Sequence, residues 1–335
     1  MKSLLYIGNK LSSHGVSVTT IETLGSLLEN EGYAVYYASS KKNLVFRMLD
    51  MLWSIVKFRK KIDLVVIDTY STSSFWYAFL TGQLARILKI GYIPILHGGN
   101  LPDRLKNNPR LSKMLFGNAC KNIAPSNYLL HHFKMNGFNN TLFIPNTIEI
   151  GSYPFKERKT IVPHLLWVRS FAKIYNPNMA VEVLQKLRRF YPEATLCMVG
   201  PDKDGSMEAA KMLAAECGLE VTFTGRLSKK EWVALSENYS IFINTTHFDN
   251  TPVSVMEAMA LGLPVISTNV GGIPYLLKDN NDALLVDDNS VDQMVAAITN
   301  LCKNETLVQT LSRNARNKAE SFDWSNVKKL WKDII

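Results

Sequence analysis

The stretch FDNTPVSVMEAMALGLPVIS, Phe248–Ser267, holds the pattern on which the fold assignment depends. A polar passage ending at Pro252 leads directly into an apolar helical stretch, Ser254–Leu261, and a short apolar run, Pro264–Ser267, follows it. Another short apolar run, Ile241–Asn244, precedes the passage. A strand, a helix and a second strand in this order are typical of a parallel β-sheet covered by helices.

The same alternation extends over nearly all of the 335 residues. Apolar runs without polar alternation are buried on both faces, so each half of the chain is expected to form a Rossmann-like, doubly wound parallel sheet. The predicted strands of the first half are Leu4–Ile7, Ala34–Ala38, Leu64–Ile67, Ile93–Leu96, Asn122–Ala124 and Thr141–Ile144. Those of the second half are His164–Val168, Thr195–Val199, Val221–Thr224, Ile241–Asn244, Pro264–Ser267 and Ala283–Val286. The predicted helices include Val18–Asn30, Ser126–Met135, Asn178–Arg189, Ser206–Cys217, Lys229–Glu237, Ser254–Leu261 and Ser290–Cys302.

A polar stretch, Asn146–Thr160, marks the expected boundary between two domains. We expect an α/β protein with a domain over residues 1–150 and a second over residues 151–321. The two domains are expected to face each other, with the ligand in a cleft at the carboxyl ends of the strands. The last segment, Phe322–Ile335, is expected either to cap the second domain or to pack back on the first.

Composition narrows the protein class. A hydrophobic content of 47% with 20% charged residues describes a globular protein. No apolar run approaches the roughly 18 residues of a membrane span, and the apolar run at the start is too short for a secretory signal. Four scattered cysteines without metal-like spacing indicate reduced thiols, so we expect a cytoplasmic protein.

Charge is distributed unevenly. Residues 1–155 contain 17 Lys and Arg against 8 Asp and Glu, whereas residues 156–335 contain 21 of each. The basic first half suits nucleic acid, anionic lipid or a phosphorylated substrate, and charge alone does not choose among them.

The passage into the helix at Pro252 has the chemistry of an anion site. Proline suits the first helical turn, and the backbone amides from Thr251 to Ser254 are expected to point outward without intrahelical acceptors. Glu257 lies about one turn further on, where a carboxylate can accept hydrogen bonds from a ribose diol. Asp249 precedes the helix and can accept hydrogen bonds from the hydroxyls of a sugar. An acidic residue near the positive end of a helix explains Asp249 equally well without a ligand.

The spacing of Asp249 and Glu257, continued by Ala258-Met259-Ala260-Leu261-Gly262-Leu263-Pro264-Val265-Ile266, resembles the signature of glycosyltransferase family 4. These are retaining transferases of GT-B architecture, with two facing Rossmann-like domains. The family usually has glutamate where this chain has Asp249. The resemblance covers nearly the whole chain and is strongest in the second half. It implies that Asp249 contacts the donor sugar, that Asn250, Thr251, Pro252, Val253 and Ser254 contact diphosphate and sugar, and that Glu257 contacts the ribose.

Two further loops fit the same resemblance. Arg169 and Lys173 follow the predicted strand His164–Val168, and an arginine can hold a phosphate through two parallel hydrogen bonds. The family has such a pair here, usually with a glycine after the lysine, where this chain has Ile174. A solvated surface pair is the other interpretation. The segment Thr222–Ser228, which contains Arg226, resembles the strand and glycine loop around the nucleotide base.

The first half contributes weaker signals. The loop that contains Gly15 follows the first strand, and the resemblance brings it near the donor diphosphate. His97 follows the strand Ile93–Leu96 and precedes Gly98-Gly99. A histidine there is by default structural, but the resemblance places His97 beside the donor sugar, near the reacting carbon. Asp68 also ends a strand and is expected to line the acceptor side.

Together these residues predict a retaining, metal-independent transferase that moves a sugar from a nucleotide-diphosphate sugar to a saccharide or lipid-linked saccharide acceptor of a surface polysaccharide. UDP is preferred over GDP because it is the commoner donor nucleotide in the family. No cofactor is expected, because the sugar nucleotide is a substrate. No metal is expected either, because Asp202 and Asp204, which imitate a metal-binding pair, lie in a polar turn. A non-catalytic sugar-nucleotide-binding protein of the same fold is the alternative. An oxidoreductase is disfavoured because no Gly-x-Gly-x-x-Gly follows a predicted strand.

The segment Lys41–Lys61 is strongly basic, with Asp50 as its one acidic residue among many apolar ones. It predicts an amphipathic helix that lies on an anionic membrane surface, peripheral at the inner face of the cell membrane, or that binds a lipid-linked diphosphate. A core helix with a solvated basic face is the other interpretation. We expect no nucleic-acid partner.

Overall fold

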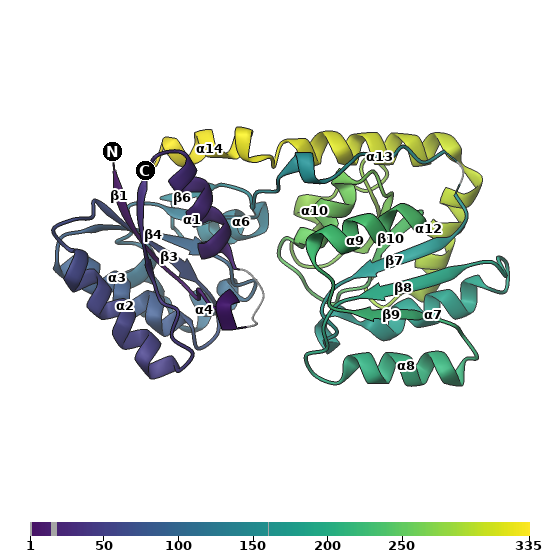
Figure 1. Cartoon of the computed structure of the whole chain (residues 1–335), viewed down its shortest axis with the longest axis horizontal. Coiled ribbons are helices and arrows are strands. Elements are labelled where there is room, and N and C mark those ends of the chain that lie inside the picture. Colours follow the sequence, from purple (N-terminus) through teal and green to yellow (C-terminus); the bar gives the residue numbers. More distant parts are fainter. Residues whose placement is uncertain (1, 15–18, 160) are drawn as a thin grey trace. The chain divides into compact units, whose positions relative to one another are not determined.

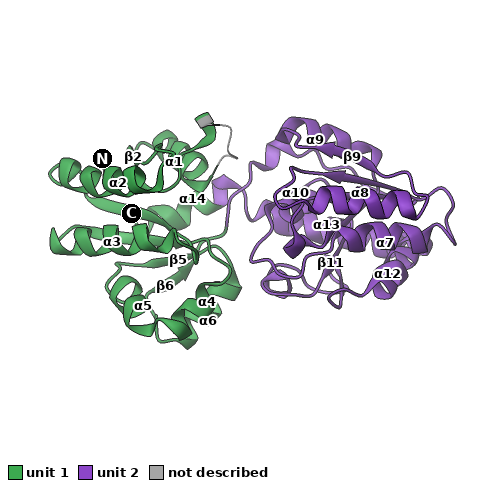
Figure 2. Cartoon of the chain, turned by 90° about the horizontal axis from the view of Figure 1, so that it is seen from below, with its two compact units in different colours: residues 1–145, 327–335 green, residues 146–326 purple. Residues whose placement is uncertain are grey.

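The computed structural model describes residues 2–14, 19–159 and 161–335. The chain divides into two compact units, one of residues 1–145 with 327–335 and one of residues 146–326 (Figure 2). Each unit has a hydrophobic core of its own. The chain passes from the first unit to the second after Pro145, a few residues before the boundary expected from the sequence.

The described residues of unit 1 form a six-stranded parallel sheet in the order β2-β1-β3-β4-β5-β6 (Figure 1). Every strand predicted in this half is present. The chain leaves β1 toward β2 and returns to place β3 on the other side of β1, so the direction of winding reverses between β1 and β3. The strands are β1 (Ser3–Ile7), β2 (Ala34–Ala38), β3 (Leu64–Thr69), β4 (Gly91–Leu96), β5 (Asn122–Ala124) and β6 (Thr141–Phe143).

Helices cover this sheet, and alternate residues of each strand face opposite layers. Leu5, Ile7, Val65 and Ile67 belong to the core that also contains Met51 of α2 and Phe75 of α3. The helices of unit 1 are α1 (Thr20–Asn30), α2 (Leu44–Phe58), α3 (Phe75–Ile87), α4 (Leu101–Asn107), α5 (Pro109–Phe116), α6 (Asn127–Met135) and, from Val327 on, the C-terminal α14 (Trp324–Lys332).

The C-terminal residues 327–335 pack on unit 1, which is the second of the two arrangements expected for Phe322–Ile335. Val327 and Trp331 of α14 are buried. Glu31, at the end of α1, accepts hydrogen bonds from the ammonium groups of Lys328 at 2.9 Å and Lys332 at 2.7 Å. One carboxylate therefore holds two successive turns of α14, because residues four apart lie on one helix face.

The described residues of unit 2 form a second six-stranded parallel sheet, in the order β12-β11-β10-β7-β8-β9. Here the winding reverses between β7 and β10, which lie side by side. The strands are β7 (His164–Val168), β8 (Thr195–Val199), β9 (Thr222–Gly225), β10 (Ile241–Asn244), β11 (Val265–Thr268) and β12 (Leu284–Val286). All six strands predicted for this half are present.

Two separate cores cover the faces of this sheet. One core contains Trp167 with residues of α7 and α12, and the other contains Leu166 with residues of α10 and α13. The helices are α7 (Pro177–Leu187), α8 (Ser206–Glu216), α9 (Lys229–Leu235), α10 (Val253–Ala260), α11 (Ile273–Leu276), α12 (Val291–Lys303) and α13 (Glu305–Glu320). Because both faces are covered, any ligand of this unit is expected at the ends of the strands.

Lys332 and Lys328 together lower the pKa of Glu31 from 4.5 to about 2. A carboxylate whose pKa is lowered by folding stabilises the folded state above its unfolded pKa, and that contribution disappears as pH falls through the folded pKa. We therefore expect Glu31→Gln to lower the melting temperature at pH 7, and the difference from wild type to disappear as pH falls from about 4.5 to about 2. Circular dichroism melts across this range measure it. Glu216→Gln, an exposed carboxylate on α8, is the control, and an equal effect of both substitutions at pH 7 would contradict the assignment.

Candidate active site

An arginine and an aspartate meet where the winding of unit 2 reverses. Arg169 directly follows β7, Asp249 follows the neighbouring β10, and the two side chains form an ion pair. Their side chains are only 17% and 11% exposed, and the guanidinium lies 4.3 Å from the centre of the Tyr175 ring. Burial lowers the pKa of Arg169, an effect that Tyr175 opposes. Among the described residues, Nε of Arg169 finds no hydrogen-bond partner although it is buried, so this cation retains a donor for a ligand.

Helix α10 begins beside this pair. The sequence placed Pro252 in the first turn, but its extended backbone (φ −70°, ψ 117°) makes it the N-cap residue, and the helix starts at Val253. The first intrahelical bonds run from the amides of Val255 and Met256 to the Pro252 carbonyl. The amides of Val253 and Ser254 precede these bonds, and no side chain caps this end of the helix in the part of the chain that the structure describes. The helix start therefore has the outward-pointing amides that the sequence predicted, which is the arrangement that can accept an anion.

Thr251 adds a second open polar atom at this helix start. Its hydroxyl is buried and has no hydrogen-bond partner within residues 2–14, 19–159 and 161–335. A buried hydroxyl without a partner costs free energy unless a ligand or water supplies one. The open atoms of Arg169 and Thr251 thus both lie on the two loops that follow β7 and β10.

The glycine pair Gly271-Gly272 determines the shape of the loop that carries Asp249. The Gly272 amide donates to the Asp249 carbonyl at 2.7 Å, and Gly271 has φ of +54°. A Cβ on Gly272 would overlap the carbonyl oxygen of Asn250, and one on Gly271 would approach the Asp249 carbonyl oxygen to 2.5 Å. A side chain at Gly272 is therefore incompatible with this loop.

Glu257 lies on α10, 6% exposed, and is already engaged within the protein. Its Oε1 accepts a hydrogen bond of 2.5 Å from the Tyr153 hydroxyl and lies 3.3 Å from the Lys229 ammonium. Burial raises the pKa of Glu257, and the contacts to Tyr153 and Lys229 oppose this effect. Sequence reasoning missed Tyr153 and Lys229, because no spacing along the chain connects them with residue 257.

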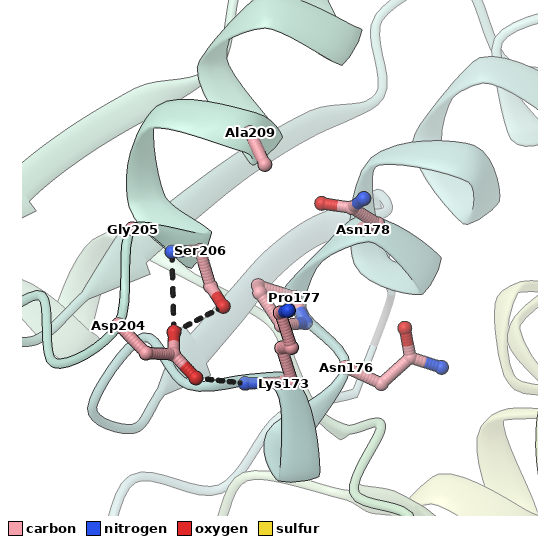
Figure 3. A pocket seen from close by; sticks show the side chains of 8 residues that line it. All are labelled: Lys173, Asn176, Pro177, Asn178, Asp204, Gly205, Ser206 and Ala209. Carbon is pink, nitrogen blue, oxygen red and sulfur yellow. Dashed lines mark hydrogen bonds between the residues drawn. The ribbon is translucent and has the colours of Figure 1, made fainter.

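Lys173 lies in a different environment from Arg169. Its backbone amide donates to Oδ2 of Asp204 at 2.9 Å, and its side chain lines a cavity of about 220 Å³. Figure 3 shows Asp204 between Lys173 and Ser206 at the start of α8. The other residues of the cavity are Asn176, Pro177, Asn178, Gly205 and Ala209.

The acidic pair that imitates a metal site has a structural role. Oδ1 of Asp202 accepts from the Gly205 amide at 3.1 Å, and Asp204 accepts from the Ser206 amide and hydroxyl. Both carboxylates thus bond to the backbone at the start of α8. In the described ranges, no three His, Cys, Asp or Glu side chains are arranged to hold a metal ion. Arg226, which directly follows β9, is exposed.

Polar groups also lie close together where the winding of the sheet in unit 1 reverses. Asp68, fully buried on β3, receives a hydrogen bond of 3.0 Å from the Tyr6 hydroxyl, and its Oδ1 lies 2.8 Å from Nε2 of His97. The other oxygen, Oδ2, is buried without a hydrogen-bond partner among the residues described. Gly8, at the end of β1, allows this approach, because a Cβ there would lie 2.5 Å from that oxygen.

His97 therefore has a carboxyl partner, Asp68, that the sequence did not assign to it. Asp68 lies near the end of β3 and His97 directly follows the neighbouring β4, and that adjacency is the signal that pairs them. The Tyr70 ring lies 5.3 Å from the imidazole. His97 belongs to unit 1, whereas Asp249, Arg169 and Glu257 belong to unit 2. Gly15, also predicted to bind the donor, lies outside the described residues.

The chain is similar to known proteins in sequence and in fold. Residues 152–318 match the family model of glycosyl transferases group 1. An uncharacterized glycosyltransferase of Haemophilus influenzae is 29% identical over 205 residues, which cover 59% of this chain and 55% of that protein. The chain thus spans about half the length of this curated relative.

Solved structures share the fold. Sucrose-phosphate synthase from Thermosynechococcus elongatus superposes with a TM-score of 0.80 at 15% identity, covering 100% of this chain and 99% of that chain. The Anabaena protein HepE in complex with UDP superposes with a TM-score of 0.79 at 16% identity, covering 99% of each chain. The two doubly wound sheets are those of a GT-B glycosyltransferase fold. Through residues 152–318, the chain belongs to the glycosyl transferases group 1 family.

Gly272→Ala tests the support of the Asp249 loop. The added methyl group must displace the Asn250 carbonyl, so we expect the free energy of unfolding to fall by about 1–3 kcal/mol. Urea unfolding followed by circular dichroism measures the change. Gly151→Ala is the matched control, since a Cβ there meets nothing within 4 Å, and it should shift stability by less than about 0.5 kcal/mol. Equal stability of the two variants would show that the loop tolerates the methyl group.

Proposed function

We propose that the protein is a retaining glycosyltransferase that uses a nucleotide-diphosphate sugar. The buried Arg169–Asp249 pair beside the uncapped start of α10 carries this proposal, because it presents a cation, open amides and a carboxylate together. A diphosphate binds to the cation and to the open amides, and a sugar hydroxyl binds to the carboxylate. Lys173 and Arg226 are proposed as further contacts to the diphosphate and base region.

The proposed donor is a UDP-sugar. Glu257 is proposed to bind the ribose, with Tyr153 and Lys229 holding its carboxylate in position. The likeness to the UDP complex of HepE concerns the fold and is consistent with a nucleotide at these loops. UDP is preferred over GDP because UDP is the commoner donor nucleotide among family 4 transferases.

In the proposed reaction the bond between the anomeric carbon and the diphosphate breaks, and a bond from that carbon to an acceptor oxygen forms on the same face. The leaving diphosphate oxygen takes the proton of the acceptor hydroxyl. Arg169 and the amides of Val253 and Ser254 stabilise the charge that develops on the diphosphate. Asp249 is assigned to sugar hydroxyls rather than to nucleophilic attack, because its carboxylate is neutralised by Arg169.

His97 is proposed to contact the donor sugar near the reacting carbon. Asp68 fixes the orientation of its imidazole through Nε2, so Asp68 is a positioning residue. No metal and no cofactor take part in this proposal. The proposed acceptor is a saccharide or a lipid-linked saccharide of a surface polysaccharide, and the proposed location is the cytoplasm. A non-catalytic sugar-nucleotide-binding protein is the second candidate, favoured only by the engagement of Glu257 within the protein.

The melting temperature of the protein, measured with UDP, GDP, UDP-sugars or NAD, identifies the nucleotide that the donor site binds. UDP at 100 times its Kd is expected to stabilise the protein by about 2.7 kcal/mol and so to raise the melting temperature, whereas NAD should leave it unchanged. A larger shift with GDP than with UDP would replace the proposed nucleotide. The absence of any shift with nucleoside diphosphates would refute the donor site.

Two substitutions separate sugar transfer from nucleotide binding. Asp249→Asn should reduce kcat by about 100-fold or more, because it removes the charge that meets the sugar hydroxyls. It should leave the Kd for UDP within about threefold, because the asparagine carbonyl oxygen can still accept a hydrogen bond from Arg169 and hold it in place. Glu257→Ala should weaken UDP by about 10- to 100-fold, the loss expected for hydrogen bonds to a charged group. Calorimetry measures the Kd for UDP. Sugar transfer is assayed in the presence of EDTA, which also tests whether the reaction needs a metal ion.

The control for both is Asp288→Asn, an exposed carboxylate that contacts His247 and should change neither quantity. Unchanged turnover in Asp249→Asn together with unchanged UDP affinity in Glu257→Ala would refute the assigned roles. Loss of all transfer on addition of EDTA would refute metal independence.

A further inference from the structure

Helix α2 exposes an apolar side where a surface helix ordinarily carries charges. Its inner side is buried through Met51, Ser54 and Ile55. Val45, Leu49 and Trp53 are spaced four residues apart and so form one row along the opposite side. They are 66%, 56% and 63% exposed, which is far more than a core role allows.

Neighbouring residues widen this row. Leu44 and Phe46 are 65% and 66% exposed. We call Leu44, Val45, Phe46, Leu49 and Trp53 the α2 apolar face. Helix α3 packs against α2, and its Trp76 and Leu80 are 47% and 40% exposed (Figure 1). Most exposed large apolar side chains in the described part of unit 1 therefore lie on these two adjacent helices.

The start of α2 is held in place. The Asn43 side chain accepts hydrogen bonds from the amides of Val45 and Phe46 and so caps the helix. Arg47, buried on the inner side, donates to the carbonyls of Lys41 and Lys42 and to the Asn9 side chain. The α2 apolar face is thus presented by an anchored helix.

Basic residues flank the α2 apolar face at both ends. Lys41 and Lys42 precede the helix, and Lys57, Arg59, Lys60 and Lys61 end it; all six are exposed. The sequence predicted an amphipathic basic helix, with a core helix that has a solvated basic face as the other interpretation. In the structure only Lys57 of these six belongs to α2, and the outer side of the helix is apolar rather than basic.

We propose that the α2 apolar face inserts into the interfacial region of an anionic lipid bilayer, with the flanking lysines and Arg59 on lipid phosphates. Apolar and tryptophan side chains enter this region while basic residues bind anionic headgroups. A second copy of the chain is a poorer occupant, because symmetric pairing of this face would bring two basic clusters together. This surface goes beyond the proposed transferase activity and does not depend on it.

Sedimentation of the full chain with vesicles tests the proposal. Binding to vesicles of equal phosphatidylglycerol and phosphatidylcholine should be at least tenfold tighter than to pure phosphatidylcholine. The variant Phe46→Gln, Leu49→Gln, Trp53→Gln should lose at least tenfold in affinity for the anionic vesicles. The variant Lys57→Gln, Arg59→Gln, Lys60→Gln, Lys61→Gln should lose the preference for anionic lipid and its dependence on salt.

Matched controls come from exposed residues of unit 2. Val162→Gln, Phe190→Gln, Met212→Gln removes three exposed apolar side chains, and Arg188→Gln, Arg189→Gln, Lys230→Gln, Lys303→Gln removes four exposed charges. Neither should change vesicle affinity by more than about twofold. Because the α2 side chains are exposed, their substitution should leave the melting temperature unchanged, and circular dichroism verifies that each variant is folded.

Three results would overturn the proposal. The first is equal vesicle binding by wild type and the α2 apolar variant. The second is loss of binding in the unit 2 controls to the same extent. The third is concentration-dependent self-association of wild type that the α2 apolar variant abolishes, which would assign the face to a second copy. UDP affinity measured on the same variants separates these results from a failure of the transferase proposal.

Discussion

The ion pair between Arg169 and Asp249 is the interaction on which the proposed chemistry of unit 2 depends. It forms because β7 and β10 are neighbours although α7, β8, α8, β9 and α9 separate them along the chain. The pair neutralises two charges that would be costly to bury singly. It also joins the loop of Arg169 to the loop that leads into α10, and the proposed diphosphate would accept hydrogen bonds from Nε and from the helix amides.

The surrounding packing keeps this pair in place. Gly271 and Gly272 let a second backbone segment lie directly against the loop of Asp249, and a hydrogen bond from the Gly272 amide joins the two. Tyr175 covers the guanidinium. Glu257, on the next helical turn, is held by Tyr153 and Lys229. A ligand would therefore meet groups whose geometry is set before binding, which limits the entropy lost on association.

Unit 1 also has polar side chains at the point where the winding of its sheet reverses. Its sheet also reverses its winding, between β1 and β3, and there Asp68 is buried against Gly8 and contacts Tyr6 and His97. The α2 apolar face lies on this unit too, between two groups of basic residues. Unit 1 thus carries a polar site at the ends of its strands and an apolar, positively flanked surface on its helices.

The sequence by itself predicted the twelve strands and the two doubly wound sheets, because buried parallel strands leave local patterns. It also singled out Arg169, Asp249 and Glu257 as candidate donor contacts, through the helix start and the resemblance to a known family. Only the tertiary structure decided the strand order, and with it the pairing of Arg169 with Asp249 and of Asp68 with His97. It also decided that Tyr153 and Lys229 hold Glu257, that Asp202 and Asp204 bond to the start of α8, and that the outer side of α2 is apolar. These contacts join residues distant in the chain, and no local periodicity records which strands become neighbours or which side of a helix the core covers.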